Sequence, residues 1–476
     1  MPPTAAHTNI NKRERHMSAD SRLPDLLACP RCDKTPLSQV DRTGEFRCVA
    51  CKVDFPSVGG IPWMFAEPRY SLGEWRNRLH FLLRHLGQDV HRIDFELKHD
   101  SLHVLTRKRL EYQRRAAQEH RDSLQKILEP MDVHASQTRY ESYLALRTRL
   151  PSDQGLNTYY PNVHRDWSWG DEENEAAFEQ IRHVLNGNDD IGDTIVLGAG
   201  ACRLAYDLHM QCQAGDTIAM DFNPLLLLVA DKITRGESLD LYEFPIAPKT
   251  MDDNAVLRTL SAEVPVRDGF HLVFGDILRP PFAMGHYDTV VTPWIIDIVT
   301  EDLPLLAARI NGLLKPGGRW INFGSLTFAH PGFSRKYSPE ETVAIVAETG
   351  FESPVVHEAT IPYMCSPASR HGRRETVFTF SASKFENVSA PARHKALPDW
   401  IVTGKESVPL GQAFKTQATT AHIYGYVMSL IDGKRSIQDM AKIMEEQKLM
   451  TRREAEPAIR TFLTRMYDDS QRQTGY

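Results

Sequence analysis

One segment near the middle of the chain, Thr194 to His209, limits the possible folds more than any other. It reads TIVLGAGACRLAYDLH, an apolar strand that breaks into glycines and restarts as a helix. A second apolar run, TIAMDFNP, follows and reaches its acidic end at Asp221. Glycines at such a turn let backbone N–H groups approach a ligand, and a carboxylate after the next strand can accept hydrogen bonds from ribose hydroxyls. The two runs therefore predict an α/β fold with a site for a nucleoside cofactor.

Three further elements follow in order and indicate which nucleoside cofactor is bound. Gly275-Asp276 ends one β-like run, YDTVVT at Tyr287 to Thr292 forms another, and LLKPGGRWINFG at Leu313 to Gly324 supplies a helix end, a turn and a strand. A glycine loop alone is weak evidence, since dinucleotide-binding enzymes share it. The order of parts resembles the class I S-adenosylmethionine-dependent methyltransferases. This resemblance implies a Rossmann-like, seven-stranded, mostly parallel sheet with helices on both faces, and a final strand, Thr376 to Ser381, that enters antiparallel at one edge.

Composition limits the class of protein. A chain of 476 residues is long enough for about three domains. Its content of 41% hydrophobic and 25% charged residues is ordinary for globular proteins. No apolar run approaches the roughly 18 residues of a membrane span, and the N-terminus has no apolar signal core, so we expect a soluble, cytoplasmic protein. A net charge of −6 gives no overall electrostatic reason to bind nucleic acid.

Two cysteine pairs near the front of the chain indicate a metal site. They are Cys29-Pro-Arg-Cys32 and Cys48-Val-Ala-Cys51, joined by fifteen residues. Four thiolates in two tight turns can close a tetrahedral site around Zn²⁺, whereas four unrelated reduced cysteines would not explain the paired spacing. With sulfur at all four positions the ion has no place for water, so we expect structural zinc. The segment, which ends at Gly60-Ile61-Pro62, resembles the zinc ribbons related to Trm112, the methyltransferase activator subunit.

The first part of the chain divides further by composition. Residues 1–22 are polar and lack periodicity, so we expect a disordered tail before the zinc ribbon at 23–68. Residues 69–150 follow as a helical spacer, in which apolar residues recur at three-to-four spacing from Leu102 until Pro130 stops the run. The spacer is rich in arginine, but acidic residues interleave with the arginines. This favours a solvated helix face, with contact to RNA as the alternative.

The segment Tyr159 to Ala176 mixes aromatic and charged residues just ahead of the glycine-containing run. It reads YYPNVHRDWSWGDEENEA. One interpretation is a surface loop that leads into a helix, where the acidic residues from Asp171 to Glu175 would be favourable in the first turn. The other is a lid over the cofactor. In that case Arg165 can pair with a carboxylate and Trp167 can face the sulfonium cation.

Several motifs together narrow the resemblance to one family. They are Val163-His-Arg-Asp-Trp-Ser168, Gly198-Ala-Gly200 followed by Arg203-Leu-Ala-Tyr206, Gly275-Asp276, Trp294-Ile-Ile-Asp297 and Gly318-Arg-Trp-Ile-Asn-Phe-Gly324. From about Tyr159 to Lys384 the chain looks like the carnosine N-methyltransferase family, whose substrate is a histidine-containing dipeptide methylated on an imidazole nitrogen. The resemblance implies that Asp297 and His330 face the substrate. It also implies that the following residues hold S-adenosylmethionine: Arg165, Trp167, Gly198, Gly200, Arg203, Asp221, Asp276 and Ile277.

The two substrate-facing residues also suit methyl transfer on chemical grounds. Transfer is an in-line displacement, so the enzyme mainly aligns a lone pair with the methyl group. A carboxylate that accepts the N–H of an imidazole fixes its tautomer and raises electron density on the opposite nitrogen. Asp297, just beyond the strand YDTVVT, is placed for this. His330 follows the strand RWINFGSL and can act as a hydrogen-bond partner or general base.

The chain departs from the family pattern in two places. Cys202 stands where the family's glycine loop usually has a third glycine, which can change how the loop approaches the cofactor. Where the family has a tyrosine cluster before its final strand, this chain reads Ser369-Arg-His-Gly-Arg-Arg374-Glu375. Guanidinium groups in place of amphipathic rings favour a substrate that bears a carboxylate or a phosphate rather than carnosine itself.

The C-terminal region predicts a small, mainly α-helical module. We expect the methyltransferase domain at 151–388, a linker at 389–405 and the module at 406–476, where apolar stripes lie at helical spacing. The sequence Leu430-Ile-Asp-Gly-Lys-Arg-Ser436 weakly resembles PqqD-like, winged-helix modules that bind peptides of ribosomally made natural products. A plain packing or dimerisation domain is favoured, and a site for a peptide or protein partner is the alternative.

These observations favour one function over two alternatives. The favoured function is an N-methyltransferase that acts on an imidazole or related nitrogen of a small histidine-containing compound or peptide. The first alternative is a peptide or RNA methyltransferase that docks its substrate through the ribbon, the spacer and the C-terminal module. The second is a non-catalytic adaptor that binds the cofactor without turning it over.

Overall fold

The computed structural model describes residues 22–40, 44–133, 159–328, 332–392 and 407–474. These divide into two compact units, residues 1–396 and 397–476. Nearly all of the expected tail at 1–22, the last part of the expected spacer and most of the expected linker lie outside the described residues. Among the helices described, none is long and apolar enough to cross a membrane.

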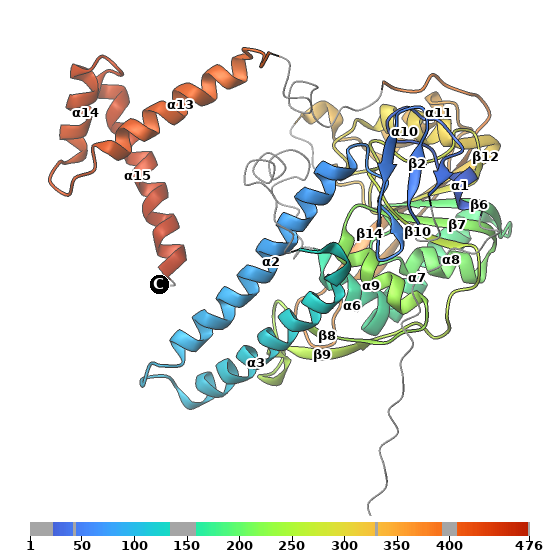
Figure 1. The fold of residues 1–476 in the computed structure, drawn as a ribbon, viewed down its shortest axis with the longest axis horizontal. Coiled ribbons are helices and arrows are strands. Elements are labelled where there is room, and N and C mark those ends of the chain that lie inside the picture. The colour runs from blue at the N-terminus through green and yellow to red at the C-terminus, as the bar shows by residue number, and fades with distance from the viewer. Residues whose placement is uncertain (1–21, 41–43, 134–158, 329–331, 393–406, 475–476) are drawn as a thin grey trace, which may run out of the picture. The chain divides into compact units, whose positions relative to one another are not determined.

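A seven-stranded sheet forms the centre of the first unit (Figure 1). In spatial order its strands are β10 (Phe270–Phe274), β7 (Gln213–Asp221), β6 (Asp190–Leu197), β11 (Tyr287–Pro293), β12 (Leu314–Gly324), β14 (Arg373–Ser383) and β13 (Val355–Tyr363). The first five are mutually parallel, and β14 is antiparallel to both of its neighbours. The predicted mostly parallel sheet is therefore confirmed. The final strand is antiparallel as predicted, but its predicted place at the sheet edge is wrong, because β13 folds back on it and takes the outer position.

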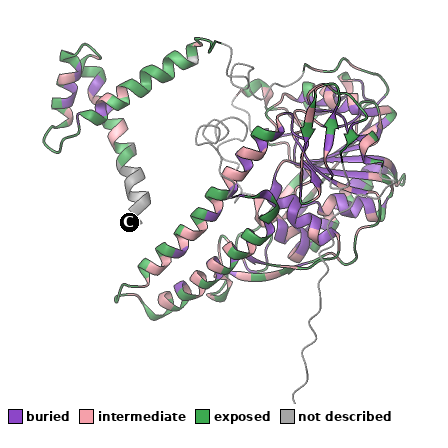
Figure 2. Cartoon of the chain, viewed as in Figure 1, coloured by how far each residue is buried: buried purple, intermediate pink, exposed green. Residues whose placement is uncertain are grey.

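Alternate side chains of the central strands enter two separate cores. In β6, Val196 packs in one core while Ile195 and Leu197 pack in the other, as the two-residue period of a strand requires. One face is covered by α7 (Asp171–Leu185), α8 (Arg203–Gln211) and α9 (Pro224–Thr234). The other is covered by α10 (Leu303–Leu313), the zinc ribbon and, beyond the short turn η4 (Phe333–Arg335), α11 (Pro339–Glu348). Figure 2 shows that the strands between these layers are mostly buried, as expected for a sheet covered on both faces.

The zinc ribbon is built from very short elements. Its parts are α1 (Leu23–Leu26), an antiparallel sheet of β1 (Ser38–Gln39), β2 (Phe46–Cys48) and β3 (Val53–Phe55), and a hairpin of β4 (Ser57–Val58) and β5 (Ile61–Pro62). Phe46 and Phe55 are paired across β2 and β3 and are fully buried. So small a segment has little apolar surface of its own, and much of its core is shared with the large sheet.

Backbone hydrogen bonds join the ribbon to the sheet. Leu27 forms an antiparallel bridge with Phe282, and Trp63 forms a parallel bridge with Phe274 at the end of β10. The N–H of Met64 donates to the carbonyl of Phe274 over 2.8 Å. The segment that follows β5 therefore runs alongside β10, the strand at one edge of the seven-stranded sheet.

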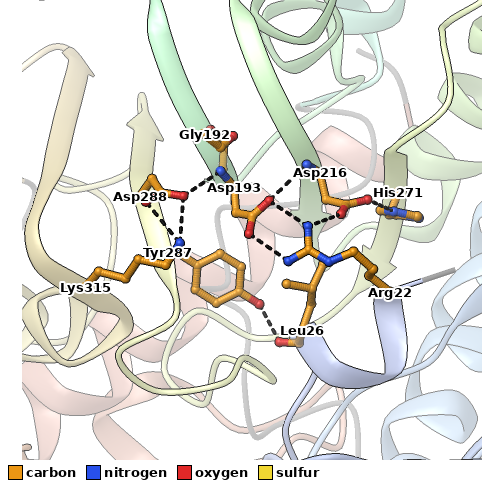
Figure 3. Close-up of polar contacts among 10 residues, drawn as sticks. Arg22, Leu26, Gly192, Asp193, Asp216, His271, Tyr287, Asp288 and Lys315 are labelled. Carbon is orange, nitrogen blue, oxygen red and sulfur yellow. Dashed lines mark hydrogen bonds and ion pairs between the residues drawn. The ribbon is translucent and has the colours of Figure 1, made fainter.

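An ionic cluster links the start of the zinc ribbon to the amino-terminal ends of the sheet strands (Figure 3). These ends lie opposite the end of β10 at which Phe274 contacts the ribbon. The guanidinium of Arg22 lies 3.1 Å from a carboxylate oxygen of Asp193 and 3.1 Å from one of Asp216. Asp216 also contacts the Nε2 atom of His271 over 2.8 Å. Close by, the buried hydroxyl of Tyr287 donates to the backbone carbonyl of Leu26. The ribbon is thus attached here to β6, β7 and β11, in addition to its contacts with β10 along the sheet edge.

Two long helices follow the ribbon and lie side by side (Figure 1). They are α2 (Pro68–Glu96) and α3 (Val104–Ile127), with the turn η1 (Glu129–Met131) after α3, so the helices expected here are present. Several arginines of this pair contact its own acidic residues, for example Arg114 with Asp94 at 2.7 Å, as expected for a solvated face. The α3 helix packs against a two-stranded ribbon of β8 (Leu239–Glu243) and β9 (Val256–Leu260), whose connection includes η3 (Asp252–Asn254).

The described part of the second unit, residues 407–474, consists of three helices with a core of its own. They are α13 (Gln412–Ser429), α14 (Ile437–Glu446) and α15 (Arg452–Thr474). Ser436 and Asp439 form a capping box that starts α14. The buried side chains of the core are Val427, Leu430, Met440, Ala441, Met444, Ala455 and Ile459. The mainly α-helical character predicted for this module is confirmed.

Candidate active site

A cavity of about 390 Å³ lies at the carboxyl ends of the parallel strands. Residues that directly follow four of these strands line it: Gly198 after β6, Phe222 after β7, Trp294 after β11 and Ser325 after β12. Open α/β sheets place their ligand sites at this edge. The rest of the wall comes from the region of Tyr159 to Ala177 and from β13 and β14. We call this space the strand-end cavity.

The glycine loop after β6 is shaped as the sequence predicts. Gly198 and Gly200 have φ angles of +72° and +59°, a region in which residues with a side chain are rarely found. A Cβ atom on Gly198 would lie 2.6 Å from the Cδ1 atom of Ile295, so the end of that side chain would have to move; together with the positive φ angle, this favours glycine here. A Cβ atom on Gly200 would meet no protein atom within 4 Å. The loop backbone at Gly200 therefore borders open space in the cavity, which suits close approach of a ligand.

Cys202, which stands where the family usually has a third glycine, adopts a backbone conformation that favours glycine. Its φ angle is +70°, and the residue caps the N-terminus of α8. Its side chain is fully buried. The left-handed conformation costs a residue with a Cβ atom about 1 to 2 kcal/mol relative to glycine. The departure noted in the sequence is therefore a strained residue in a loop of the expected shape.

Asp221 ends β7 and reaches back to the glycine loop. Its carboxylate accepts hydrogen bonds from the N–H groups of Gly200 and Asn223, each over 2.8 Å. The residue lines the cavity and is only 6% exposed. Burial raises the pKa of Asp221 to about 6, although the backbone N–H groups oppose the rise. Strand β7 thus places a carboxylate beside the loop, at the position where the sequence predicts contact with a ribose.

The segment before α7 is helical, so the predicted surface loop is wrong, although the acidic residues from Asp171 do occupy the first turn of a helix, α7, as predicted. It forms α6 (Pro161–His164) and a π-helical turn, η2 (Arg165–Trp169). Arg165 lines the cavity together with Asp166, 2.7 Å away, and Glu173, 3.5 Å away. Burial alone would lower the pKa of Arg165, but the two carboxylates raise it overall, so the guanidinium stays charged. A cation and two anions therefore meet on one wall of the cavity.

Trp167 and Arg203 do not line the strand-end cavity, contrary to the expectation that Trp167 faces a sulfonium there. The indole N–H of Trp167 donates to the carbonyl of Ala201 over 2.7 Å, and its ring lies against Tyr206. Arg203 pairs with Asp207 at 2.9 Å. The π-helical turn directs the Trp167 ring beneath the glycine loop, where it supports the loop from behind.

Three other predicted residues are placed away from the cavity or outside the described residues. Asp276 accepts a hydrogen bond from the N–H of Leu278 over 2.9 Å, and neither Asp276 nor Ile277 lines the strand-end cavity. Ile277 packs at the margin of the core that contains the ribbon. His330 lies outside the described residues.

Asp297 lies on the cavity wall just beyond β11, as its sequence position predicts. Its Oδ2 atom accepts a hydrogen bond from the hydroxyl of Ser325 over 2.6 Å and another from the N–H of Thr327 over 3.1 Å. Burial raises the pKa of Asp297, and these two donors oppose the rise. Because both bonds end on Oδ2, Oδ1 is the oxygen that can accept a hydrogen bond from a substrate.

Three aromatic residues of the cavity were missed as individual sites in the sequence. The rings of Trp294 and Tyr363 lie 4.8 Å apart, and Trp294 has a φ angle of +52°, an uncommon conformation often found at ligand sites. Burial raises the pKa of Tyr159 to about 12, and the negative charges of Asp221 and Asp297 contribute. Trp294 lies two residues beyond the strand predicted at Tyr287 to Thr292, a signal that could have identified it. Tyr363 ends β13, far from the glycine loop in sequence.

One arginine of the segment that departs from the family also reaches the cavity. Arg373 and Glu375 line it and form an ion pair with each other. The guanidinium of Arg373 lies over the ring of Tyr363, 4.5 Å from its centre. Arg370 and Arg374 do not line this cavity. The expected group of cations at the site is therefore one arginine that is already paired with a carboxylate.

The four cysteines of the ribbon are positioned to bind a metal ion. The sulfur atoms of Cys29, Cys32, Cys48 and Cys51 all lie within 4.8 Å of one another, and those of Cys32 and Cys48 are 3.6 Å apart. A tetrahedral site with Zn–S bonds of about 2.3 Å requires sulfur atoms roughly 3.8 Å apart. The N–H of Cys51 also points to the sulfur of Cys48 over 3.4 Å. The geometry and the all-thiol ligand set agree with the predicted structural zinc.

The fold and the strand-end cavity, together with comparisons to known proteins, define the class of protein. It is an S-adenosylmethionine-dependent methyltransferase. Residues 154–384 match the sequence model of the carnosine N-methyltransferase family. Its cofactor is S-adenosylmethionine, and the open space at Gly200 beside the Asp221 carboxylate fits an adenosyl group.

Solved structures and curated sequences cover different parts of the chain. Phosphoethanolamine N-methyltransferase 2 of Haemonchus contortus is 15% identical, and the match covers 48% of this chain and 57% of that one with a TM-score of 0.31. The N-methyltransferase NodS of Bradyrhizobium japonicum is 13% identical over 48% of this chain and 99% of its own, with a TM-score of 0.32. The zinc ribbon matches a UPF0434 protein of Methylibium petroleiphilum, 42% identical over 55 residues and 83% of that protein, so this segment belongs to the UPF0434 family.

Proposed function

We propose that the protein transfers a methyl group from S-adenosylmethionine to an imidazole or related nitrogen of a small histidine-containing compound or peptide. The observation that supports this most directly is the position of Asp297. Its buried carboxylate, held on one oxygen by Ser325 and Thr327, lies in the same cavity as the glycine loop and Asp221. The cofactor site and a hydrogen-bond acceptor for the substrate thus share one space.

Different residues of the cavity would bind different parts of the cofactor. The backbone at Gly198 and Gly200 would contact the adenosyl part, and Asp221 would accept hydrogen bonds from the ribose. The wall formed by Arg165, Asp166 and Glu173 suits the zwitterionic end of an amino acid, because the guanidinium can bind its carboxylate while the two acids attract its ammonium.

When bound, S-adenosylmethionine supplies a methyl group on a positively charged sulfur, which is displaced as the new nitrogen–carbon bond forms. The Oδ1 atom of Asp297 would accept the N–H of the substrate imidazole, which keeps the lone pair on the opposite nitrogen. Once that nitrogen carries the methyl group, the ring is a cation and the N–H proton can pass to Asp297. The raised pKa of this carboxyl makes it a better base for that step. Tyr159, Trp294 and Tyr363 would enclose the reacting groups.

The test is mass spectrometry of purified protein incubated with S-adenosylmethionine and a panel of histidine, histidine dipeptides, histidine-containing peptides and bulk tRNA. We expect a gain of one methyl group on an imidazole compound and its loss, by 100-fold or more, in Asp297→Asn. The matched control is Asp302→Asn, because Asp302 lies five residues further on, binds the Tyr337 hydroxyl and does not line the cavity. If methyl transfer reached only non-imidazole acceptors, or survived in Asp297→Asn, the proposal would be wrong.

We also place this activity in the cytoplasm. Four reduced cysteines that hold a metal suit a reducing compartment better than an oxidising one.

A further inference from the structure

A second cavity, of about 800 Å³, adjoins the strand-end cavity. Its walls come from the α2–α3 pair, the α6–η2 segment, the residues after β8 and the residues after β13. Asn162, Tyr363 and Arg373 line both cavities and therefore lie at their junction. We call the second cavity the side chamber.

The two spaces differ in what they can hold. Pockets for drug-sized ligands usually measure about 300 to 1,000 Å³. The strand-end cavity, at about 390 Å³, has to accommodate the cofactor and the reacting end of the acceptor. Any larger part of the acceptor needs space elsewhere. The side chamber provides roughly twice that volume directly beyond Tyr363 and Arg373.

The chamber wall is mainly apolar and its polar groups are mostly neutral or paired. Leu86, Ile93 and Ala117 contribute aliphatic surface from the two helices. Burial lowers the pKa of His120 to about 4, so this imidazole is uncharged near neutral pH. Glu243 pairs with Arg258 over 2.9 Å. Such a wall favours an uncharged, apolar occupant over a phosphate or a polyanion.

Two buried polar atoms of residues that line the chamber have no hydrogen-bond partner among the described residues. They are Nδ1 of His164 and Nε1 of Trp169. Nε2 of His164 lies 3.2 Å from the carbonyl of Tyr242, so this nitrogen carries the hydrogen and Nδ1 can only accept. The indole nitrogen can only donate. Burial lowers the pKa of His164 to about 3, so neither this ring nor the Trp169 indole adds a charge to the chamber wall.

From the junction with the strand-end cavity and the apolar, largely uncharged wall, we propose that the side chamber binds the residues that flank the methylated one. The natural acceptor is then a peptide longer than a dipeptide, with uncharged, apolar residues next to the acceptor side chain. This inference rests on the proposed function for the identity of the reacting nitrogen. Binding of the flanking residues in the chamber is inferred independently of that function.

The experiment compares two variants of the chamber with a matched control. Ala117→Phe fills part of the chamber from α3, and Ile246→Glu places a charge on its wall at a residue that is 82% exposed and therefore carries little risk to folding. Glu111→Phe is the control, because Glu111 is exposed on α3 and lines neither cavity. Melting temperature and affinity for S-adenosylhomocysteine verify that all three variants fold.

Two measurements are made with each protein. The first is kcat/KM for histidine and for acetyl-Leu-His-Leu amide. We expect the wild-type protein to favour the longer acceptor by at least tenfold, and Ala117→Phe and Ile246→Glu to remove that preference without changing turnover of histidine. The second is calorimetric binding, with S-adenosylhomocysteine present, of acetyl-Leu-Phe-Leu amide, which has no imidazole. We expect both chamber variants to weaken this binding at least tenfold and Glu111→Phe to leave it unchanged.

The two measurements separate the two proposals. Binding of the phenylalanine peptide that depends on the chamber supports the chamber even if no imidazole is methylated, in which case only the proposed function fails. The proposal for the chamber would be wrong if histidine and the longer peptide were turned over equally well and neither chamber variant changed peptide binding. The proposed function would then remain intact. Methylation of tRNA without peptide binding would also overturn the proposal for the chamber.

Discussion

Substitution of Asp221 by asparagine should separate folding stability from cofactor affinity. In the folded protein two N–H groups donate to this carboxylate, each over 2.8 Å. Asparagine has one acceptor oxygen, so one bond to a charged group is lost, at a cost of about 1.5 to 3 kcal/mol. Against this, a carboxyl pKa raised to about 6 from the usual ~3.9 means that the charged form is about 3 kcal/mol less favourable in the folded protein than a neutral form, and this difference already includes the hydrogen bonds to the N–H groups. Asparagine is neutral and avoids this cost, so we expect its melting temperature to equal that of wild type or to exceed it by a few degrees.

Cofactor affinity should respond differently to the same change. Two ribose hydroxyls can donate to an ionised carboxylate, whereas the asparagine oxygen replaces it as a weaker, uncharged acceptor. Loss of one bond to a charged group, about 1.5 to 3 kcal/mol, corresponds to a Kd raised by roughly 10- to 150-fold. Isothermal titration of S-adenosylhomocysteine at pH 7.5 measures this. A variant that binds as tightly as wild type would refute the assignment of Asp221 to the ribose.

The pH dependence gives a second signature of Asp221. Because its folded-state pKa of about 6 lies above the unfolded value of ~3.9, its contribution to stability is complete below pH ~3.9 and is lost as the pH rises through about 6. Cofactor affinity should change in the opposite sense and weaken as the pH falls below about 6, because the protonated carboxyl accepts poorly. Asp207→Asn is the control, since burial also raises the pKa of Asp207 to about 6 but its side chain does not line the cavity. The affinity profile should flatten in Asp221→Asn and persist in Asp207→Asn. A wild-type profile in Asp221→Asn would contradict the reasoning.

Two further predictions concern the ribbon and the glycine loop. Removal of zinc by a chelator should lower the melting temperature, because small metal domains gain roughly 10 kcal/mol or more from the ion and the ribbon shares its core with the large sheet. An unchanged melting curve after metal analysis has verified the loss would argue against a structural role. Cys202→Ala should be less stable than Cys202→Gly by about 1 kcal/mol in denaturant unfolding, since only glycine relieves the φ angle of +70°. The opposite order would show that this conformation is not strained.

The site residues that could be predicted from the sequence lie at or just beyond the carboxyl ends of parallel strands. Gly198, Gly200, Asp221 and Asp297 each follow a strand closely, so recognition of the strand also located the side chain. The same reasoning misplaced Trp167, because it lies in a π-helical turn whose extra residue rotates the ring beneath the glycine loop. Local sequence gave no indication of that turn.

The parts of the site that could not be predicted depend on packing between distant segments. Tyr363 and Arg373 reach the cavity because β13 and β14 form an antiparallel pair, with Tyr363 directly opposite Arg373. Because the final strand was predicted to lie at the edge of the sheet, its pairing with β13 was not expected. The side chamber exists because α3 packs against the β8–β9 ribbon, and periodicity in the helix shows which face is apolar but not which partner covers it.

The bridge between Trp63 and Phe274 also bears on how this protein avoids self-association. Strand β10 is an edge strand of the large sheet. An uncovered edge strand has unpaired N–H and carbonyl groups that can pair with another protein molecule. Here the segment after β5 occupies part of that position within the same molecule, through a backbone hydrogen bond at Phe274. If the ribbon unfolds without zinc, as predicted above, the supply of zinc during synthesis would also decide whether this strand is shielded or left open to aggregation.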